Sequence, residues 1–309
     1  ILREVMAEEG FDPNVVLLAA DAADRPITKE LVLHKDVAIV DFTGSSAFGR
    51  WVREAAVGKQ VYTEEAGLNA IIVDSTDSLR GMASNIAFSL SLYSGQMCTA
   101  PQNVFVPAGG IATDQGRKSF DEVADAIRIA VDKLLGDPER AAAILGAVQS
   151  AETSRRVADA AALGRVIRAS ETADGAAART ASPLILAVDA ADEDAYMAER
   201  FGPISFIIRS RDVAEAIGRA AGAARSHGAI SAALYSTDEA VIAQASEAMA
   251  EAGVTLSINL TGGVFVNQNA AFSDFHVTGA NPAGNASLTD AAFVANRFRV
   301  VGVKRQVAA

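Results

Sequence analysis

The sequence is poor in several features that mark specialised classes of protein. It contains a single cysteine, Cys98, which excludes a disulfide framework and suits a reducing compartment such as the cytoplasm. Its longest clean apolar run, Val15 to Ala20, ends at Asp21 and is too short to cross a membrane. The 27 basic residues are outnumbered by 38 acidic ones, and this net charge of −11 argues against a nucleic-acid partner.

The composition also excludes a disordered chain, because half of the 309 residues are hydrophobic and no long run of like charges interrupts them. At roughly 150 residues per domain, this length corresponds to about two domains or to one large one. The chain opens at Ile1, with Leu2, Val5 and Met6 at helical spacing and no segment that resembles a signal peptide. We therefore expect a fragment of a longer protein or a processed chain.

Short apolar runs rich in Val and Ile alternate with Ala-rich stretches of helical periodicity. The predicted strands are Val15–Ala19, Val37–Val40, Ile71–Val73, Asn103–Pro107, Leu184–Val188, Ile204–Ile208, Ser231–Tyr235 and Val264–Asn267. The predicted helices cover residues 28–33, 46–56, 78–94, 116–135, 139–163, 212–224 and 238–251. Strands that are apolar on both faces are typical of a mostly parallel sheet covered by helices, so the pattern predicts an α/β fold.

The last alternating segment, Arg297–Val307, is followed by no helix. A strand in this position needs a pairing partner, so we expect it to lie at a sheet edge or to pair with another subunit.

A glycine-rich turn from Asp41 to Arg50 follows a predicted strand and opens a predicted helix. The free N–H groups at such a helix start favour an anionic ligand. The spacing from Gly44 to Gly49 is that of a P-loop, but Arg50 and Trp51 stand where that motif needs Lys and then Ser or Thr, so a P-loop is excluded. On the turn alone, an ordinary junction between a strand and a helix is the simpler interpretation.

Cys98 lies between a predicted helix and a predicted strand, close to Gly95. A lone cysteine is more often a small buried apolar residue, although this position also suits a nucleophile. The three histidines have no partner at a recognisable spacing, so the sequence offers no local support for a Cys–His hydrolase. No cluster of Cys, His, Asp or Glu has the spacing of metal ligands, and no metal site is expected.

Glu64 and Glu65 end a short predicted strand, and only one of them can face a given site because adjacent strand residues point to opposite sides. The alternative is a solvated acidic pair. Glu199 precedes the turn at Gly202 and Pro203. Its carboxylate can accept hydrogen bonds from a ribose or pair with a cation at the surface, and alone it decides neither.

In this order along the chain, these segments resemble the motifs of the aldehyde dehydrogenase superfamily. The Phe-Thr-Gly-Ser turn of that family is matched at residues 42–45, its Gly-Gln-x-Cys segment at 95–98 and its Glu-x-Phe-Gly-Pro segment at 199–203. Its Glu-Leu-Gly-Gly segment is matched loosely from Glu64. Because Glu64 precedes Cys98 by 34 residues, the usual family spacing from catalytic glutamate to cysteine, the resemblance selects Glu64 rather than Glu65.

The resemblance implies an aldehyde dehydrogenase-like catalytic domain with a mostly parallel sheet, preceded by a remnant of a Rossmann-like cofactor domain. We place the remnant at residues 1–64, the catalytic domain at 65–285 and a tail with an oligomerisation strand at 286–309. The chain would then be the C-terminal portion of an enzyme that forms a homo-oligomer, a dimer or larger. The absent portion would carry most of the dinucleotide-binding sheet.

The resemblance also implies the chemistry. Cys98 is the nucleophile that forms a thiohemiacetal and then a thioester with a small-molecule aldehyde, and Glu64 is the base that activates the hydrolytic water. The cofactor, NAD or NADP, is contacted by Thr43, Gly44, Ser45, Glu199 and Phe201. In this scheme the Gly44 turn meets the phosphates and the Glu199 carboxylate meets a ribose hydroxyl.

Two departures from the common family pattern resemble one branch. Glu64 is followed by Glu65-Ala66-Gly67 instead of Leu-Gly-Gly, and residues 272–276 and 279–282 replace the usual glycine-rich segment near the C-terminus. This pattern resembles the branch that acts in phenylacetic acid degradation (PaaN-like proteins). The resemblance implies a ring-opened semialdehyde as the substrate.

Two other interpretations stay open. The chain can be a non-catalytic fragment that folds and self-associates through Arg297–Val307 but does not hold a nucleotide. It can also be a cysteine hydrolase or thioesterase that uses Cys98 without a cofactor. The three interpretations differ in nucleotide binding and in the turnover of an activated ester.

Overall fold

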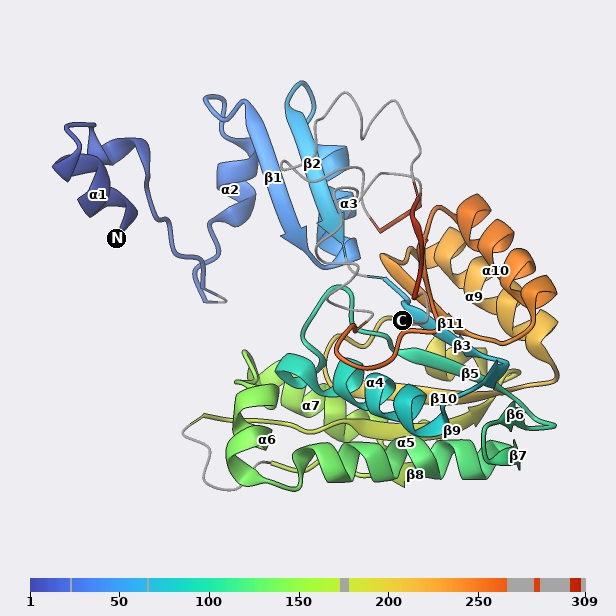
Figure 1. Ribbon diagram of the computed structural model, residues 1–309. Coiled ribbons are helices and arrows are strands. Elements are labelled where there is room, and N and C mark those ends of the chain that lie inside the picture. Colours follow the sequence, from blue (N-terminus) through green and yellow to red (C-terminus); the bar gives the residue numbers. More distant parts are fainter. Residues whose placement is uncertain (23, 66, 173–177, 266–280, 284–300, 307–309) are drawn as a thin grey trace.

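The computed structural model describes residues 1–22, 24–65, 67–172, 178–265, 281–283 and 301–306 (Figure 1). In this part of the chain the strands form an eight-stranded, a three-stranded and a two-stranded sheet. The eight-stranded sheet has the order β13-β12-β11-β3-β5-β10-β9-β8, and each pair is parallel except β8–β9. The predicted α/β fold with a mostly parallel sheet is therefore confirmed.

Eight strands form the large sheet, and its inner strands are largely buried on both faces, whereas both edge strands carry exposed residues. The eight strands are β3 (Ala70–Val73), β5 (Asn103–Pro107), β8 (Arg165–Arg168), β9 (Leu184–Asp189), β10 (Ile204–Ser210), β11 (Ser231–Tyr235), β12 (Thr255–Ile258) and β13 (Val303–Arg305). Every residue of β3, β5, β11 and β12 is buried. Because both faces are covered, most successive positions carry apolar side chains, which is why the runs of Val, Ile and Ala mark these strands in the sequence.

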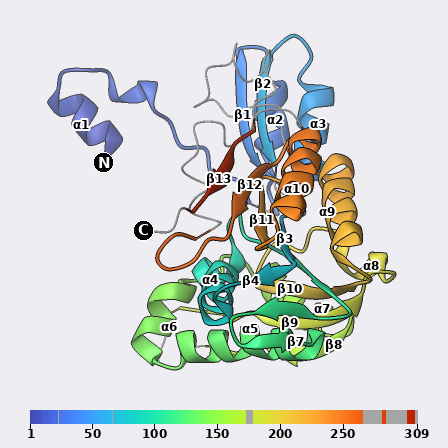
Figure 2. The same cartoon turned by 45° about the vertical axis from the view of Figure 1, so that its right-hand side comes forward.

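Helices cover both faces of the large sheet (Figures 1 and 2). On one face the core includes residues of α8 (Glu193–Tyr196), α9 (Val213–His227) and α10 (Glu239–Ala252). On the other face it includes residues of α4 (Leu79–Ser91) and α5 (Phe120–Leu135). Neighbouring strand residues alternate between the two cores: Ile72 belongs to the first and Ile71 to the second.

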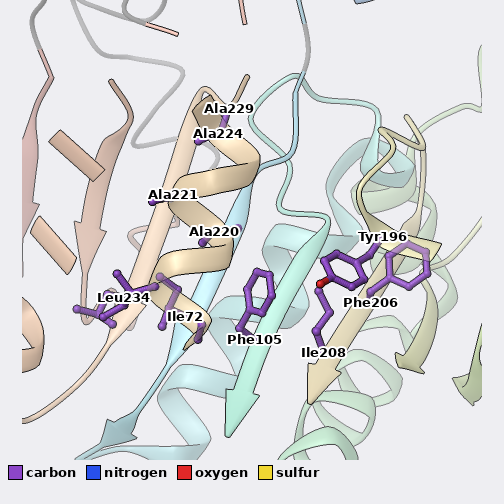
Figure 3. Packing of buried hydrophobic residues seen from close by; sticks show 14 of the residues in the cluster. Ile72, Phe105, Tyr196, Phe206, Ile208, Ala220, Ala221, Ala224, Ala229 and Leu234 are labelled. Atoms are coloured by element: carbon purple, nitrogen blue, oxygen red, sulfur yellow. The ribbon is translucent and has the colours of Figure 1, made fainter. Parts of the chain in front are cut away.

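The first core is built from large strand side chains under small helix side chains. In Figure 3, alanines of α9 lie over the strands that carry Ile72, Phe105 and Leu234. Tyr196 packs edge-on against Phe105, with ring centroids 6.0 Å apart. Alanine lets the helix backbone approach the sheet closely while the aromatic rings fill the space beside it.

The first part of the chain forms a smaller layer beside the large sheet (Figures 1 and 2). Strands β1 (Ile39–Gly44) and β2 (Gln60–Glu65) pair in parallel. Helices α2 (Thr28–Leu33) and α3 (Ser46–Ala55) share a small apolar cluster with them.

The other elements are α1 (Leu2–Glu8), 3-10 helices at Pro13–Val15 and Leu92–Gly95, β4 (Ser75–Thr76), β6 (Ile111–Thr113), β7 (Gly116–Lys118), α6 (Pro138–Leu145) and α7 (Ala151–Ala160). None of the helices described here combines the length and the apolar character that crossing a membrane requires.

Three predicted elements are wrong. Val15–Ala19 is not a strand: no described strand lies beside it to supply hydrogen bonds, and Leu18 is 92% exposed. The helix predicted over 139–163 is two helices, α6 and α7, because Gly146 with φ +58° ends the first. The helix predicted over 116–135 starts only at α5, because β7 occupies 116–118 and Ser119 forms a capping box.

The C-terminal part of the large sheet also differs from the prediction. Strand β12 was not predicted, and the described residues of the predicted strand Val264–Asn267, Val264 and Phe265, belong to no strand. Within Arg297–Val307, strand β13 pairs with β12 at the sheet edge of the same chain. The oligomerisation role and the three-part division of the chain stay predictions. Residues 272–276, 279–280, 286–300 and 307–309 lie outside the described residues.

Candidate active site

Two of the motif segments meet at the amino ends of parallel strands of the large sheet. The loop that carries Cys98 leads into β5, and the segment of Glu199 leads into β10. Cys98, Glu199 and Phe201 line one small cavity. Its volume of about 20 Å³ gives room for roughly one water molecule.

The chain reaches Cys98 through a strained turn. After α4, Tyr93 (φ 52°), Ser94 (φ 54°) and Gly95 (φ 63°) are all left-handed. Such a conformation costs a residue with a side chain on the order of 1–3 kcal/mol, so surrounding contacts must stabilise it. The Ser94 hydroxyl does so: it donates to the carbonyl of Leu145 (3.0 Å) and accepts from the backbone N–H of Ala181 (3.3 Å).

Gln96 ties the same turn to the segment between α6 and α7. Its Nε2 donates to the carbonyls of Tyr93 and Ala147, both at 2.9 Å, and its Oε1 accepts from the N–H of Gln149 at 3.0 Å. The glutamine of the Gly-Gln-x-Cys segment therefore has a structural function in this chain: it holds the approach to Cys98 against a neighbouring loop.

The Gly-Gln-x-Cys segment at residues 95–98 and the Glu-x-Phe-Gly-Pro segment at residues 199–203 are in direct contact. A Cβ added to Gly95 would lie 2.5 Å from the carbonyl oxygen of Gly202. No side chain fits between the two backbones at this distance. Gly95 is therefore required both for its positive φ and for the close approach of the segment that carries Glu199.

Cys98 itself is half-buried and packs against Ile230 and Ala283. Ala283 comes from the short described stretch 281–283, which Asn281 fixes by accepting from the N–H groups of Ala229 (3.2 Å) and Ala283 (2.9 Å). Part of the wall beside the thiol is thus formed by Ala283, the residue that directly follows the segment 279–282.

The Glu199 carboxyl is also half-buried, and this burial raises its pKa to about 7, with Arg156 acting in the opposite direction. Arg156 also donates to the carbonyl of Phe201. Near neutral pH the Glu199 carboxyl is therefore divided between its neutral and ionised forms, which is common for carboxyls in functional clefts.

A buried amide that the sequence analysis did not identify supports Glu199. Gln102 donates through Nε2 to the carbonyls of Tyr196 (3.1 Å) and Ala198 (3.2 Å) and accepts the N–H of Arg200 (2.8 Å). It therefore fixes the backbone on both sides of Glu199. Asn69 is also buried, and its Nδ2 donates to the carbonyls of Cys98 (2.7 Å) and Ala100 (3.0 Å). No local pattern marks either residue, because their partners are remote in sequence.

Glu64 and Glu65 have different surroundings. Glu65 is 1% exposed, and its carboxylate is ion-paired with Arg53, whose guanidinium also donates to Thr63. The carboxylate fills the space beside Gly49, where a Cβ would lie 2.4 Å from Glu65 Oε1. Glu64 is half-buried beside Thr43 of β1. It is not among the residues that line the Cys98 cavity, although Gly67, three residues later, is.

The predicted cofactor turn lies in the smaller layer. The Ser45 hydroxyl caps α3 by accepting from the N–H of Phe48 at 3.4 Å. Helix α3 has ten residues, and its amino end, which carries partial positive charge, opens at the Gly44 turn. Thr43, Gly44, Ser45 and Glu64 thus share one layer, whereas Cys98, Glu199 and Phe201 share the cavity. In the described residues, no group of three or more metal-ligating side chains occurs.

Comparison with known proteins gives a consistent result. The sequence model of the "Aldehyde dehydrogenase family" matches residues 1–286. A crystal structure of an NAD-dependent aldehyde dehydrogenase from Burkholderia multivorans is 54% identical and covers 96% of this chain and 54% of its own, with a TM-score of 0.89. Geranial dehydrogenase of Castellaniella defragrans is 34% identical over 154 residues, which is 49% of this chain and 30% of that protein.

A more distant structure has the same fold. NADP-dependent glyceraldehyde-3-phosphate dehydrogenase of Bacillus halodurans, solved with NADP, is 23% identical with a TM-score of 0.62, and the match covers 84% of this chain and 52% of its own. The chain therefore spans about half the length of these solved relatives and less of the curated one.

Proposed function

The chain belongs to the aldehyde dehydrogenase family, and from this premise we propose that it is the C-terminal portion of an enzyme that oxidises an aldehyde to a carboxylic acid. One observation carries the proposal: the lone thiol of Cys98 and the carboxyl of Glu199 line the same cavity. Each of the two is positioned by a buried amide side chain, Asn69 or Gln102.

The residues present fit a dinucleotide. The amino end of α3, capped by Ser45 behind the Gly44 turn, suits a diphosphate, and the Glu199 carboxyl suits a ribose hydroxyl. Thr43 and Phe201 complete this set. Two solved relatives are named for NAD and NADP, and we extend this to the present chain as NAD or NADP. When bound, the nicotinamide supplies a hydride acceptor.

Cys98 would do the covalent chemistry. Its thiolate attacks the aldehyde carbon, and the carbonyl π electrons move to oxygen to give a thiohemiacetal. Loss of hydride from that carbon leaves a thioester on Sγ. A water then attacks the thioester, the carboxylic acid leaves, and the thiolate is restored.

Glu64 would take the proton of that water. Its neighbour Glu65 is unsuited to this function, because it is buried in an ion pair with Arg53. Glu64 lies at the end of β2, and the chain passes from there to Gly67 in the cavity wall within three residues.

The test is hydrolysis of p-nitrophenyl acetate by this chain without nucleotide. We expect a stoichiometric burst that Cys98→Ala abolishes. Glu64→Gln should keep the burst and slow the steady state, whereas the exposed control Glu247→Gln should change neither. An undiminished steady state in Glu64→Gln would refute the base assignment. Repeated rapid turnover that nucleotide leaves unchanged would favour the hydrolase interpretation instead.

A second candidate is the non-catalytic fragment. It is favoured by the cavity of about 20 Å³, which has no room for a nicotinamide ring, and by the half-length match to solved relatives. Calorimetric titration with NAD and with NADP separates the two. Micromolar binding supports the catalytic proposal, and absence of binding together with a Cys98-dependent burst means that the thiol site is assembled without a cofactor site.

We further propose a ring-opened semialdehyde of phenylacetate catabolism as the substrate, in a cytoplasmic homo-oligomer. The substrate assignment is supported by Ala283, which directly follows the segment 279–282 and packs against Cys98. The domain division at 64/65 and 285/286 belongs to the same proposal. Rates with a panel of aliphatic, aromatic and ring-opened aldehydes test the substrate, and sedimentation velocity tests the assembly.

A further inference from the structure

We propose that Asn69 is a positioning residue that holds the Cys98 loop in the geometry needed for acylation; this inference rests on the proposed function. Asn69 directly precedes β3 and is 1% exposed. It lies 29 positions before Cys98 in the sequence. It lies in the wall of the Cys98 cavity, and its hydrogen bonds act on the backbone of the loop.

Hydrogen bonds use both ends of the Asn69 amide. Its Nδ2 donates to the carbonyls of Cys98 (2.7 Å) and Ala100 (3.0 Å). Its Oδ1 accepts from the N–H groups of Ile230 and Ser231, both at 2.9 Å. The side chain therefore joins the nucleophile loop to the start of β11.

Ser231 extends the same arrangement. Its hydroxyl donates to the carbonyl of Thr99 at 3.0 Å, so three successive carbonyls, from Cys98 to Ala100, are held by two buried side chains. The loop has no ladder or helix of its own here. These side chains help to orient its backbone, together with a turn bond from the N–H of Ala100 to the carbonyl of Met97 (3.0 Å).

Only an amide of this length satisfies all four partners. An aspartate is isosteric and keeps two acceptor oxygens, but it has no donor for the carbonyls of Cys98 and Ala100. An alanine loses both functions. Aspartate therefore removes only the hydrogen bonds to the Cys98 loop, whereas alanine also removes those to Ile230 and Ser231 at the start of β11.

The experiment compares Asn69→Asp and Asn69→Ala with the unaltered chain. The single thiol allows acylation by p-nitrophenyl acetate and alkylation by iodoacetamide to be read at Cys98 alone. Acylation needs a positioned thiol, whereas alkylation needs only an accessible thiolate. We expect the ratio of the two rate constants to fall at least tenfold in both variants.

Hydrogen exchange measures how well the backbone amides of the Cys98 loop are protected, independently of activity. In Asn69→Asp the amides of residues 97–100 and 102 should exchange faster while Ile230 and Ser231 stay protected, and in Asn69→Ala both regions should exchange faster. Asn85→Asp is the matched control, because Asn85 is 2% exposed and its Nδ2 donates to the carbonyl of Val264 at 2.6 Å, outside the Cys98 loop. It should leave the ratio and the loop exchange unchanged.

Unchanged loop exchange and an unchanged ratio in Asn69→Asp would overturn the proposal, as would equal effects in Asn85→Asp. If Asn69→Ala does not fold, Ser231→Ala is the second variant, and a smaller fall in the ratio is expected because only the Thr99 carbonyl is released. If the unaltered chain shows no burst, the proposed function fails. The hydrogen exchange then decides alone whether Asn69 holds the loop.

Discussion

The carboxyl of Glu199 makes the stability of the chain depend on pH in a defined direction. Burial raises its pKa from 4.5 to about 7, so the folded chain holds this proton to a higher pH than the unfolded chain does. The contribution of this proton to the free energy of unfolding is fully present below about pH 4.5 and is lost as the pH rises towards 7. Above pH 7 the folded state carries the cost of a poorly solvated carboxylate.

The magnitude follows from the same values. A rise from 4.5 to about 7 corresponds to a ceiling of about 3 kcal/mol, and solvent that reaches this half-buried group lowers the expected cost to roughly 1–3 kcal/mol. Glu199→Gln keeps the shape of the protonated side chain and removes its titration. At pH 8 the substitution should raise the free energy of unfolding by that amount, and at pH 4 it should leave it nearly unchanged.

Urea unfolding followed by far-UV circular dichroism at both pH values provides the measurement. Glu247→Gln, on the exposed face of α10, is the control and should stay within about 0.5 kcal/mol at either pH. If the gain for Glu199→Gln is the same at pH 4 and pH 8, burial of the ionised carboxyl is not its cause. Under the proposed function the same substitution should weaken nucleotide binding, so stability and affinity should move in opposite directions.

Other substitutions test other parts of the structure, each by urea unfolding. Gly95→Ala should lower the free energy of unfolding by about 2 kcal/mol or more, because its Cβ would clash with the carbonyl of Gly202. A decrease below about 0.5 kcal/mol would show that the two backbones move apart at little cost. Ser119→Ala removes the capping box with Glu122 and should cost about 1 kcal/mol, with Glu122→Ala costing less. Arg168→Lys keeps the charge but loses the planar donor group, which bonds an acidic side chain, a hydroxyl and backbone carbonyls, and should cost about 2 kcal/mol.

Strands buried on both faces were the most predictable part of this fold. The apolar runs at Asn103–Pro107 and Ser231–Tyr235 are strands with the predicted bounds. Strand β12 was missed because Thr255 and Ser257 interrupt its apolar pattern, yet both are buried. The strand predicted at Val15–Ala19 was wrong for the opposite reason: its residues are apolar, but an apolar run becomes a strand only where another strand pairs with it.

The candidate site was predictable only in part. The motifs identified Cys98 and Glu199, which line one cavity. Asn69 and Gln102 carry no motif, because their function depends on partners far along the chain, such as Ser231, 162 positions beyond Asn69. A buried amide is recognised by its contacts, and single-sequence patterns do not contain these.

The remote partners of Asn69 have a consequence for how the chain folds. The contacts around Cys98 join residues near positions 69, 98 and 231, so they form only after β3, β5 and β11 have come together in the sheet. Such non-local pairing is slow relative to helix formation, because large loops must close first. The native surroundings of the thiol therefore arise late in folding, and the single cysteine of the chain is a natural kinetic reporter for completion of the central sheet.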